Sequence, residues 1–311
     1  MRKEIPYPRR QFIRSILKSG VALAFGALSD FEVNGRENLP PGGPLLVVGN
    51  HFNFLDPLTF IHSLPYPLEF VGGAKMPNAP KVTHFLQRMF GVIPTARGTV
   101  SRDTFYGAES ILRQNGVLGI FPEGGSWATV LRPARPGAAF LAWRTNARVL
   151  PVGIDGTVKF FDHLRKGRVK VTINIGVPYG PLNTDPHKRP SREELDDIGH
   201  TIMRSIAPLI PAERRGFYSD DPAIRARLQP LREWTQAKLR EQRDDYELRR
   251  REGWIRECHG DLHLANMALI DGRVTIFDCL EFAEDLRWID PLSEAAFLYM
   301  DLEQRAHTVL A

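Results

Sequence analysis

Residues 45–57 are Leu45-Leu46-Val47-Val48-Gly49-Asn50-His51-Phe52-Asn53-Phe54-Leu55-Asp56-Pro57. The apolar beginning predicts a buried strand. Asp56 and Pro57 predict the start of a helix, because Asp is a favoured N-cap and Pro suits the first helical turn. Regular helical spacing would place His51 and Asp56 on different sides of the axis, so they meet only if a turn lies between them. There the carboxylate would orient the imidazole as a base that works near neutral pH. The alternative is structural, with Asp56 as a helix cap and His51 as a buried histidine.

Short apolar runs alternate with helix-like stretches along the first part of the chain. The runs that predict strands are 45–48, 68–71, 117–121, 149–154 and 169–175. The stretches that predict helices are 57–63, 79–90, 102–114 and 135–146. This alternation is typical of an α/β fold in which helices cover a sheet. His51 and Glu123 each follow a predicted strand, so we expect the loops at the strand ends to bring them together.

Three further segments accompany the block from His51 to Asp56, namely Gly91 to Arg97, Phe121 to Gly125 and Val149 to Ile154. In this order the four segments resemble the glycerolipid acyltransferase family, which includes glycerol-3-phosphate and 1-acylglycerol-3-phosphate acyltransferases. The resemblance covers about residues 31–180. It implies a mixed sheet of the acyltransferase type, flanked by helices.

The chain departs from the family pattern after Phe-Pro-Glu-Gly. The family continues with a small residue, Arg and Ser, whereas Gly125, Ser126 and Trp127 stand here. The absent arginine leaves open whether the acceptor carries a phosphate. Arg132 and Arg135 follow closely and are candidates to replace it.

The resemblance implies an O-acyltransferase of phospholipid biosynthesis. It would move a fatty acyl group from acyl-CoA or acyl carrier protein, as co-substrate, to a hydroxyl of a lysophospholipid-like acceptor. His51 would be the general base and Asp56 its orienting partner. Acceptor binding would fall to Arg97, Phe121, Pro122, Glu123 and Gly124. No cofactor and no metal site is expected for this reaction.

The first 30 residues predict an amphipathic helix. Its apolar residues recur at helical spacing, and Arg14 and Lys18 fall on the other side. The uncharged run 19–29 is shorter than the ~20 residues that span a bilayer. We expect the helix to lie in the membrane interface, as a peripheral attachment at the cytoplasmic face of the inner membrane. The alternatives are a helix packed on the domain and a twin-arginine export signal at Arg9-Arg10.

The composition restricts the partners. The formal net charge is +5 and the sequence pI is near 9.3. A positive excess suits anionic lipid, CoA or nucleic acid, but no nucleic-acid-binding motif is present, so no nucleic acid partner is expected. Cys258 and Cys279 are too few for a disulfide framework and favour a reducing compartment.

The remaining chain divides into a domain over 31–210, which the resemblance implies is an acyltransferase domain, a linker over 211–222 and a final segment over 223–311. In this final segment, residues 258–266 and 275–278 resemble the catalytic core of the aminoglycoside phosphotransferase family, which is related to protein kinases. The resemblance implies that Asp261 positions a substrate hydroxyl and that Asn266 and Asp278 bind Mg²⁺.

A kinase also needs a glycine-rich loop and a strand lysine before this core, and neither precedes residue 259. The segment is therefore interpreted as a partial, vestigial kinase-like module that needs Mg²⁺ only if it is active. Two alternatives to acyl transfer stay open. One is a small-molecule phosphotransferase that uses the final segment, and the other is a catalytically decayed, membrane-associated protein.

Overall fold

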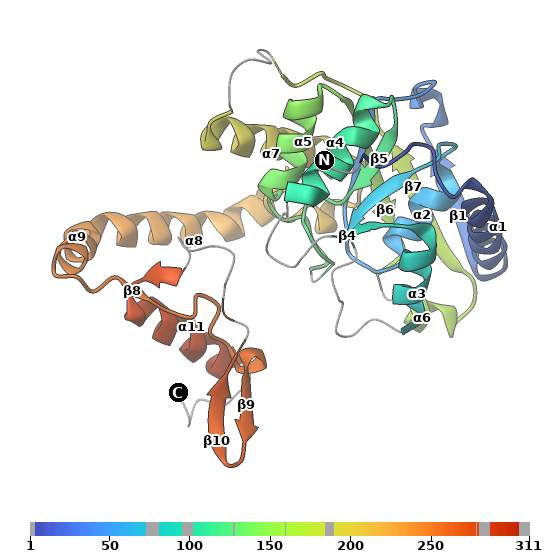
Figure 1. The fold of residues 1–311 in the computed structure, drawn as a ribbon. Coiled ribbons are helices and arrows are strands. Elements are labelled where there is room, and N and C mark those ends of the chain that lie inside the picture. Colours follow the sequence, from blue (N-terminus) through green and yellow to red (C-terminus); the bar gives the residue numbers. More distant parts are fainter. Residues whose placement is uncertain are drawn as a thin grey trace. The chain divides into compact units, whose positions relative to one another are not determined.

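The computed structural model describes residues 4–72, 81–94, 102–126, 128–158, 160–183, 190–277, 279 and 287–304. The chain divides into two compact units, Met1–Arg225 and Ala226–Ala311 (Figure 1). Each unit has its own strands.

The described part of the first unit contains a seven-stranded mixed sheet. Its strands are β1 (Ser29–Asn34), β2 (Leu45–Gly49), β3 (Glu69–Gly72), β4 (Ile93–Pro94), β5 (Val117–Ile120), β6 (Arg148–Asp155) and β7 (Val169–Ile175). The strand order is β1-β7-β6-β2-β5-β3-β4. All neighbours run parallel except β6 and β7, which are antiparallel. The expected α/β fold with a mixed sheet is confirmed.

Helices cover both faces of this sheet. They are α1 (Gln11–Leu28), α2 (Asp56–Ser63), α3 (Lys81–Phe90), α4 (Arg102–Arg113), α5 (Pro136–Thr145), α6 (Phe160–Leu164) and α7 (Arg192–Ile206). Because side chains alternate along a strand, Leu46 and Val48 pack with the core under α4, α5 and α7. Leu45 and Val47 pack with the opposite core, under α1, α2, α3 and α6. Figure 1 shows these two helical layers on either side of the sheet. β2 is thus buried on both faces.

The sequence did not predict three of these elements, β1, β4 and α6. The expected linker over 211–222 is also wrong. Short 3₁₀ turns at Ala212–Arg214 and Gly216–Tyr218 pack against the first unit instead. Tyr218 is buried in its core, and the Leu131 N–H donates to the Arg214 carbonyl at 2.8 Å. The buried Tyr218 side chain, which mostly polar residues surround in the sequence, holds this segment against the first unit.

Helix α1 binds the domain through its basic side. The Arg14 side chain is buried, and its guanidinium makes two hydrogen bonds to the carboxylate of Glu69, which is fully buried at the start of β3. Arg9 donates to the same carboxylate at 2.8 Å. Lys18 donates to the Leu64 carbonyl at 2.9 Å. The expected amphipathic helix is present. Its cations Arg14 and Lys18, however, bind groups of the protein rather than lipid headgroups.

The outer face of α1 carries no charge. Its exposed residues are Gln11, Phe12, Ser15, Ile16, Ser19, Gly20, Leu23, Ala24, Gly26, Ala27 and Leu28. Phe12 is 79% and Leu23 is 76% exposed. Within the described ranges, no helix is both long enough and apolar enough to cross a bilayer.

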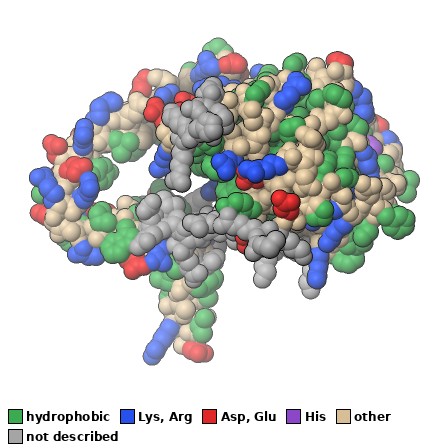
Figure 2. Space-filling view, turned by 45° about the horizontal axis from the view of Figure 1, so that its top comes forward, with side chains coloured by type: hydrophobic (Ala, Val, Ile, Leu, Met, Phe, Trp, Pro, Cys, Tyr) green, Lys and Arg blue, Asp and Glu red, His purple; other side chains and the backbone are tan. Residues whose placement is uncertain are grey.

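The described part of the second unit contains the following helices and strands. They are most of α8 (Pro222–Glu241), α9 (Arg243–Arg251), β8 (Arg256–Glu257), β9 (Met267–Ile270), β10 (Arg273–Ile276), β11 (Trp288–Ile289) and α11 (Pro291–Gln304). α8 continues through Pro230. None of the apolar side chains described in this unit is buried. Figure 2 likewise shows hydrophobic side chains at the surface among charged ones.

Candidate active site

His51 and Asp56 meet across the turn between β2 and α2. The His51 Nδ1 atom lies 3.1 Å from Asp56 Oδ2. Asn53 closes the turn, because its Oδ1 accepts the Leu55 N–H at 3.0 Å and its carbonyl accepts the Asp56 N–H at 3.1 Å. The predicted contact between the histidine and the aspartate is therefore confirmed.

Asp56 does not cap the helix, contrary to prediction. α2 begins at Asp56 with Leu55 as the N-cap residue. The Asp56 carboxylate instead turns back, and its Oδ2 accepts the N–H groups of Phe52 and Asn53, both at 2.7 Å. Since Oδ2 acts as an acceptor for both amides, the His51 contact is a hydrogen bond in which Nδ1–H donates. This tautomer leaves the Nε2 lone pair to take up a proton.

Asn50 fixes the end of β2 to the neighbouring strand β6. Its Nδ2 donates to the Ile154 carbonyl at 2.9 Å, and its Oδ1 accepts the Ile154 N–H at 2.8 Å. Asn50 is fully buried. A buried side-chain amide whose donor and acceptor are both hydrogen-bonded keeps one orientation. The residue directly before His51 is therefore held in place.

The loop after β5 brings Phe121 and Glu123 to His51. β5 lies beside β2 in parallel register, so both strands end at the same edge of the sheet. The Phe121 ring stacks on the His51 ring with centroids 4.4 Å apart. Glu123 Oε1 accepts the His51 backbone N–H at 3.0 Å. The expected meeting of His51 and Glu123 is confirmed, although Glu123 binds the backbone of His51 rather than its ring.

The turn after β5, from Phe121 to Gly124, depends on its glycine. Its N–H donates to the Phe121 carbonyl at 3.1 Å, and its φ of 75° lies in the left-handed region. A Cβ atom here would lie 3.2 Å from the Arg135 side chain. The Pro122 carbonyl accepts the Arg135 N–H at 2.7 Å. Pro122 and Gly124 therefore shape this turn.

Arg132 and Arg135 contact this turn. Both follow Gly125-Ser126-Trp127, where the family pattern has an arginine. Arg132 Nε lies 3.6 Å from Glu123 Oε2, and Arg132 Nη2 donates to the Gly125 carbonyl at 2.8 Å. Arg135 packs on Gly124. Arg132 therefore lies beside Glu123, and the replacement of the family arginine by Arg132 or Arg135 stays a prediction.

Burial raises the pKa of Glu123 to about 7, while the His51 N–H and the charge of Arg132 act in the opposite direction. Between pH 4.5 and 7 the unfolded chain loses this proton and the folded protein keeps it. The free energy of unfolding therefore falls as the pH rises through this window, by about 3 kcal/mol in all.

Glu123→Gln removes this titration while keeping the shape of the side chain. We expect the free energy of unfolding of the variant, relative to the wild type, to increase by about 3 kcal/mol between pH 5 and pH 8. Urea unfolding at several pH values measures the difference. Glu37→Gln, at an exposed position, is the control and should follow the wild type. A constant difference between the Glu123 variant and the wild type would contradict the expectation.

The structure tests the other predicted positions only in part. Arg97 and Asp278 lie outside the described residues. In the second unit, Asn266 Nδ2 donates to the Asp261 carbonyl at 2.9 Å and lies 3.5 Å from Asp261 Oδ2. These two residues are therefore adjacent, but the resemblance of this segment to a kinase core and their expected function stay predictions.

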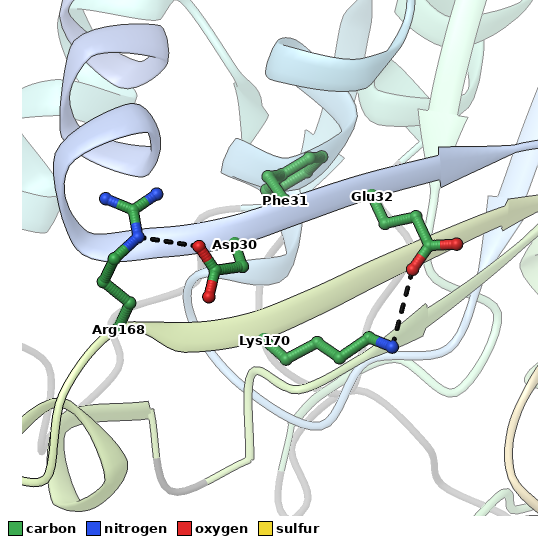
Figure 3. Close-up of a pocket in the computed structure, with 5 residues that line it drawn as sticks. All are labelled: Asp30, Phe31, Glu32, Arg168 and Lys170. Carbon is green, nitrogen blue, oxygen red and sulfur yellow. Dashed lines mark hydrogen bonds and ion pairs between the residues drawn. The ribbon is translucent and has the colours of Figure 1, made fainter.

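A surface hollow lies at one edge of the sheet, along β1 and β7 (Figure 3). None of the predicted site residues lines it. Its charges pair with one another, Arg168 with Asp30 at 2.7 Å and Lys170 with Glu32 at 3.5 Å. These ion pairs join two neighbouring strands, so the candidate chemistry remains at His51.

Residues 30–155 match the family model described as acyltransferase, and the match contains the turn, the Glu123 loop and β6. This segment is an acyltransferase-family domain. Over 132 residues the chain is 30% identical to the 1-acyl-sn-glycerol-3-phosphate acyltransferase of Borreliella burgdorferi. The aligned segment covers 42% of this chain and 52% of that protein. The matched segment thus contains His51, Asp56, Phe121 and Glu123.

Two further similarities were found. An uncharacterized protein of Mycobacterium tuberculosis is 47% identical over 53 residues, 17% of this chain and 11% of that protein. The crystal structure of the 1-acyl-sn-glycerophosphate acyltransferase from Thermotoga maritima superimposes with a TM-score of 0.46 and 25% identity, over 65% of this chain and 83% of that chain. The chain spans about half or less of the length of the curated relatives it matches.

Proposed function

We propose that the first unit transfers a fatty acyl group from a thioester, acyl-CoA or acyl carrier protein, to a hydroxyl of a lysophospholipid. The observation that carries this proposal is the His51–Asp56 pair, built into an acyltransferase-family domain. The sequence relative in Borreliella burgdorferi, a 1-acyl-sn-glycerol-3-phosphate acyltransferase, supports an acceptor of this class.

The chemistry follows from the tautomer at His51. Nε2 takes the proton of the acceptor hydroxyl, while Asp56 at Nδ1 stabilises the imidazolium that forms. The alkoxide attacks the thioester carbonyl, the tetrahedral intermediate collapses, and the thiolate leaves with the proton returned by His51. Among the described residues, the hydrogen-bond partner of the His51 ring is a carboxylate rather than Ser or Cys. The acyl group therefore passes directly from thiol to hydroxyl.

Product analysis by mass spectrometry tests the proposal. The full chain is incubated with mixed acyl-CoAs and a lysolipid library, and new diacyl products are identified by mass. The His51→Ala protein is the inactive control. Asp261→Asn, in the second unit, should leave transfer unchanged. Failure to consume any thioester, from CoA or from acyl carrier protein, with any lysolipid would reject the proposal.

We also propose that α1 attaches the protein peripherally to a lipid surface. Arg14 and Lys18 hold the helix on the domain, and its outward face is uncharged and rich in apolar groups. A helix that turns its apolar residues away from the protein core exposes hydrophobic surface to water, and burial among acyl chains would remove that cost. The acceptor proposed here is itself a membrane lipid.

The outward face of α1 should control vesicle binding. Phe12→Ser, Ile16→Ser and Leu23→Ser together remove the largest apolar groups, so we expect binding to weaken by at least about 10-fold. Vesicle co-sedimentation measures the change. Val177→Ser with Phe217→Ser, also at exposed apolar positions, is the control. Equal binding of the triple variant and the wild type would reject this function of α1.

Point substitutions are the better design here than deletion of the helix. Deletion of residues 1–29, the helix together with the segment before it, would remove Arg9 and Arg14 and leave the buried Glu69 carboxylate without its two cations. A loss of binding would then be confounded by a loss of stability.

A further inference from the structure

Thr157 lies in the loop that follows β6 and contacts the candidate active site directly. Its Oγ1 donates to Asp56 Oδ1 at 2.7 Å, and both residues are fully or almost fully buried. Among the described residues, Thr157 is the hydrogen-bond donor that the structure gives to this carboxylate oxygen. The other oxygen, Oδ2, is held by the turn and by His51.

The sheet explains how Thr157 reaches this place. β2 lies between β5 and β6, and all three strands run parallel. Their carboxyl ends therefore deliver His51, Glu123 and Thr157 to one edge. The paired hydrogen bonds between Asn50 and Ile154 fix β6 beside the end of β2, three residues before Thr157.

The loop of Thr157 is itself fixed by two further features. Gly156 has φ of 88°, and a Cβ atom there would lie 2.0 Å from the Lys170 carbonyl oxygen, so only glycine fits. Beyond Thr157, the Phe161 ring of α6 stacks on Phe54 of the turn, with centroids 6.0 Å apart. The segment after β6 thus meets the turn at two points, and Thr157 is presented from a constrained backbone.

We infer that Thr157 is a positioning residue for the proposed acyl transfer, and that it acts through Asp56 to orient His51. The inference depends on the proposed function. With a donor on each oxygen, the Asp56 carboxylate cannot rotate about its Cβ–Cγ bond without losing a hydrogen bond. This orientation keeps Oδ2 directed at His51 Nδ1 and leaves the Nε2 lone pair toward the acceptor hydroxyl.

Thr157→Val keeps the volume and removes the hydroxyl. We expect kcat to fall at least about 10-fold with little change in KM, because a hydrogen bond to a buried charge is lost at a group that does not bind substrate. Thr157→Ser restores the hydroxyl and should recover kcat to within about threefold of the wild type. Thr145→Val, which removes a hydroxyl bonded to a helix carbonyl in α5, is the matched control.

A second readout does not require activity. With ¹⁵N-labelled histidine, the ring nitrogen shifts of His51 report which nitrogen carries the proton. We expect a predominant Nδ1–H tautomer in the wild type and in Thr157→Ser, and a mixture in Thr157→Val. A purely structural contribution of Thr157 would leave the tautomer unchanged.

The outcomes separate the two hypotheses. An active wild type with unchanged kcat and unchanged tautomer in Thr157→Val overturns the inference and leaves the proposed function standing. A wild type that transfers no acyl group rejects the proposed function, while the tautomer still tests the coupling of Thr157 to His51. If Thr157→Val does not fold, Thr157→Ser against Thr157→Ala gives the same comparison of a hydroxyl with none, and equal values in that pair overturn the inference.

Discussion

Replacement of His51 by alanine is expected to lower acyl transfer by at least about 10²-fold, and by as much as about 10⁴-fold. The imidazole is the base that removes the acceptor proton. Its Nδ1 atom lies 3.1 Å from the Asp56 carboxylate, so the variant also leaves this carboxylate without the ring that it orients. His51 is partly exposed, with 13% of its side chain accessible, so the ring is reachable from solvent. Steady-state transfer with the acyl-CoA and lysolipid pair found by product analysis measures the loss.

The control for this variant is His163→Ala, at an exposed histidine of α6. It should retain wild-type turnover. Circular dichroism and the unfolding midpoint check that His51→Ala keeps the fold, since it loses only a stack on Phe121 and one hydrogen bond. Turnover close to that of the wild type in a folded His51→Ala protein would remove this residue from the mechanism.

The second large effect concerns stability. Glu69→Gln is expected to lower the free energy of unfolding by about 3–5 kcal/mol, because it leaves buried cationic charge without its partner. Glu69 is fully buried, and the side chains of Arg14 and Arg9 are only 8% and 20% exposed. Urea unfolding measures the change. Protease cleavage within α1 should also accelerate, since this carboxylate holds the start of the helix.

Two comparisons make the result specific. Glu32→Gln removes a carboxylate from an exposed ion pair with Lys170 and should change stability by no more than about 1 kcal/mol. Adding Arg14→Met to Glu69→Gln removes part of the uncompensated charge and should recover some of the loss. A Glu69→Gln protein as stable as the Glu32→Gln protein would show that the buried cluster contributes little.

Local patterns predicted much of the fold. The strands β2, β5 and β6 lie within one residue of their predicted limits, because apolar runs in a parallel sheet are buried on both faces. β7 has its predicted limits because Val and Ile alternate with polar residues along it. β1 was missed because its residues alternate between buried or half-buried and exposed positions at the edge of the sheet. Ser191 and Glu194 form a capping box at the start of α7, and their spacing of three residues is the sequence pattern for it.

Two parts of the candidate site were predictable, the pair within one turn and Glu123, which like His51 follows a predicted strand. His51 and Asp56 share one turn, so their spacing was informative. Thr157 is 101 residues from Asp56, and no local pattern shows that β6 lies next to β2. The available signal was its position just after a predicted strand.

The orientation of α1 could not be predicted for a similar reason. Periodicity places Arg14 on the side away from the apolar stripe, and a charged side usually faces water. A buried carboxylate 55 residues further along the chain reverses this preference. Long-range charge pairing thus decided which side of the helix is inside.

The inward arginine and lysine of α1 have a consequence for adhesion to bilayers. A surface helix that offers no cation to phospholipid headgroups gains nothing from their negative charge. Its attachment would therefore be insensitive to ionic strength and would tolerate zwitterionic and acidic leaflets alike. Any preference for anionic bilayers would have to come from basic groups elsewhere in this positively charged chain.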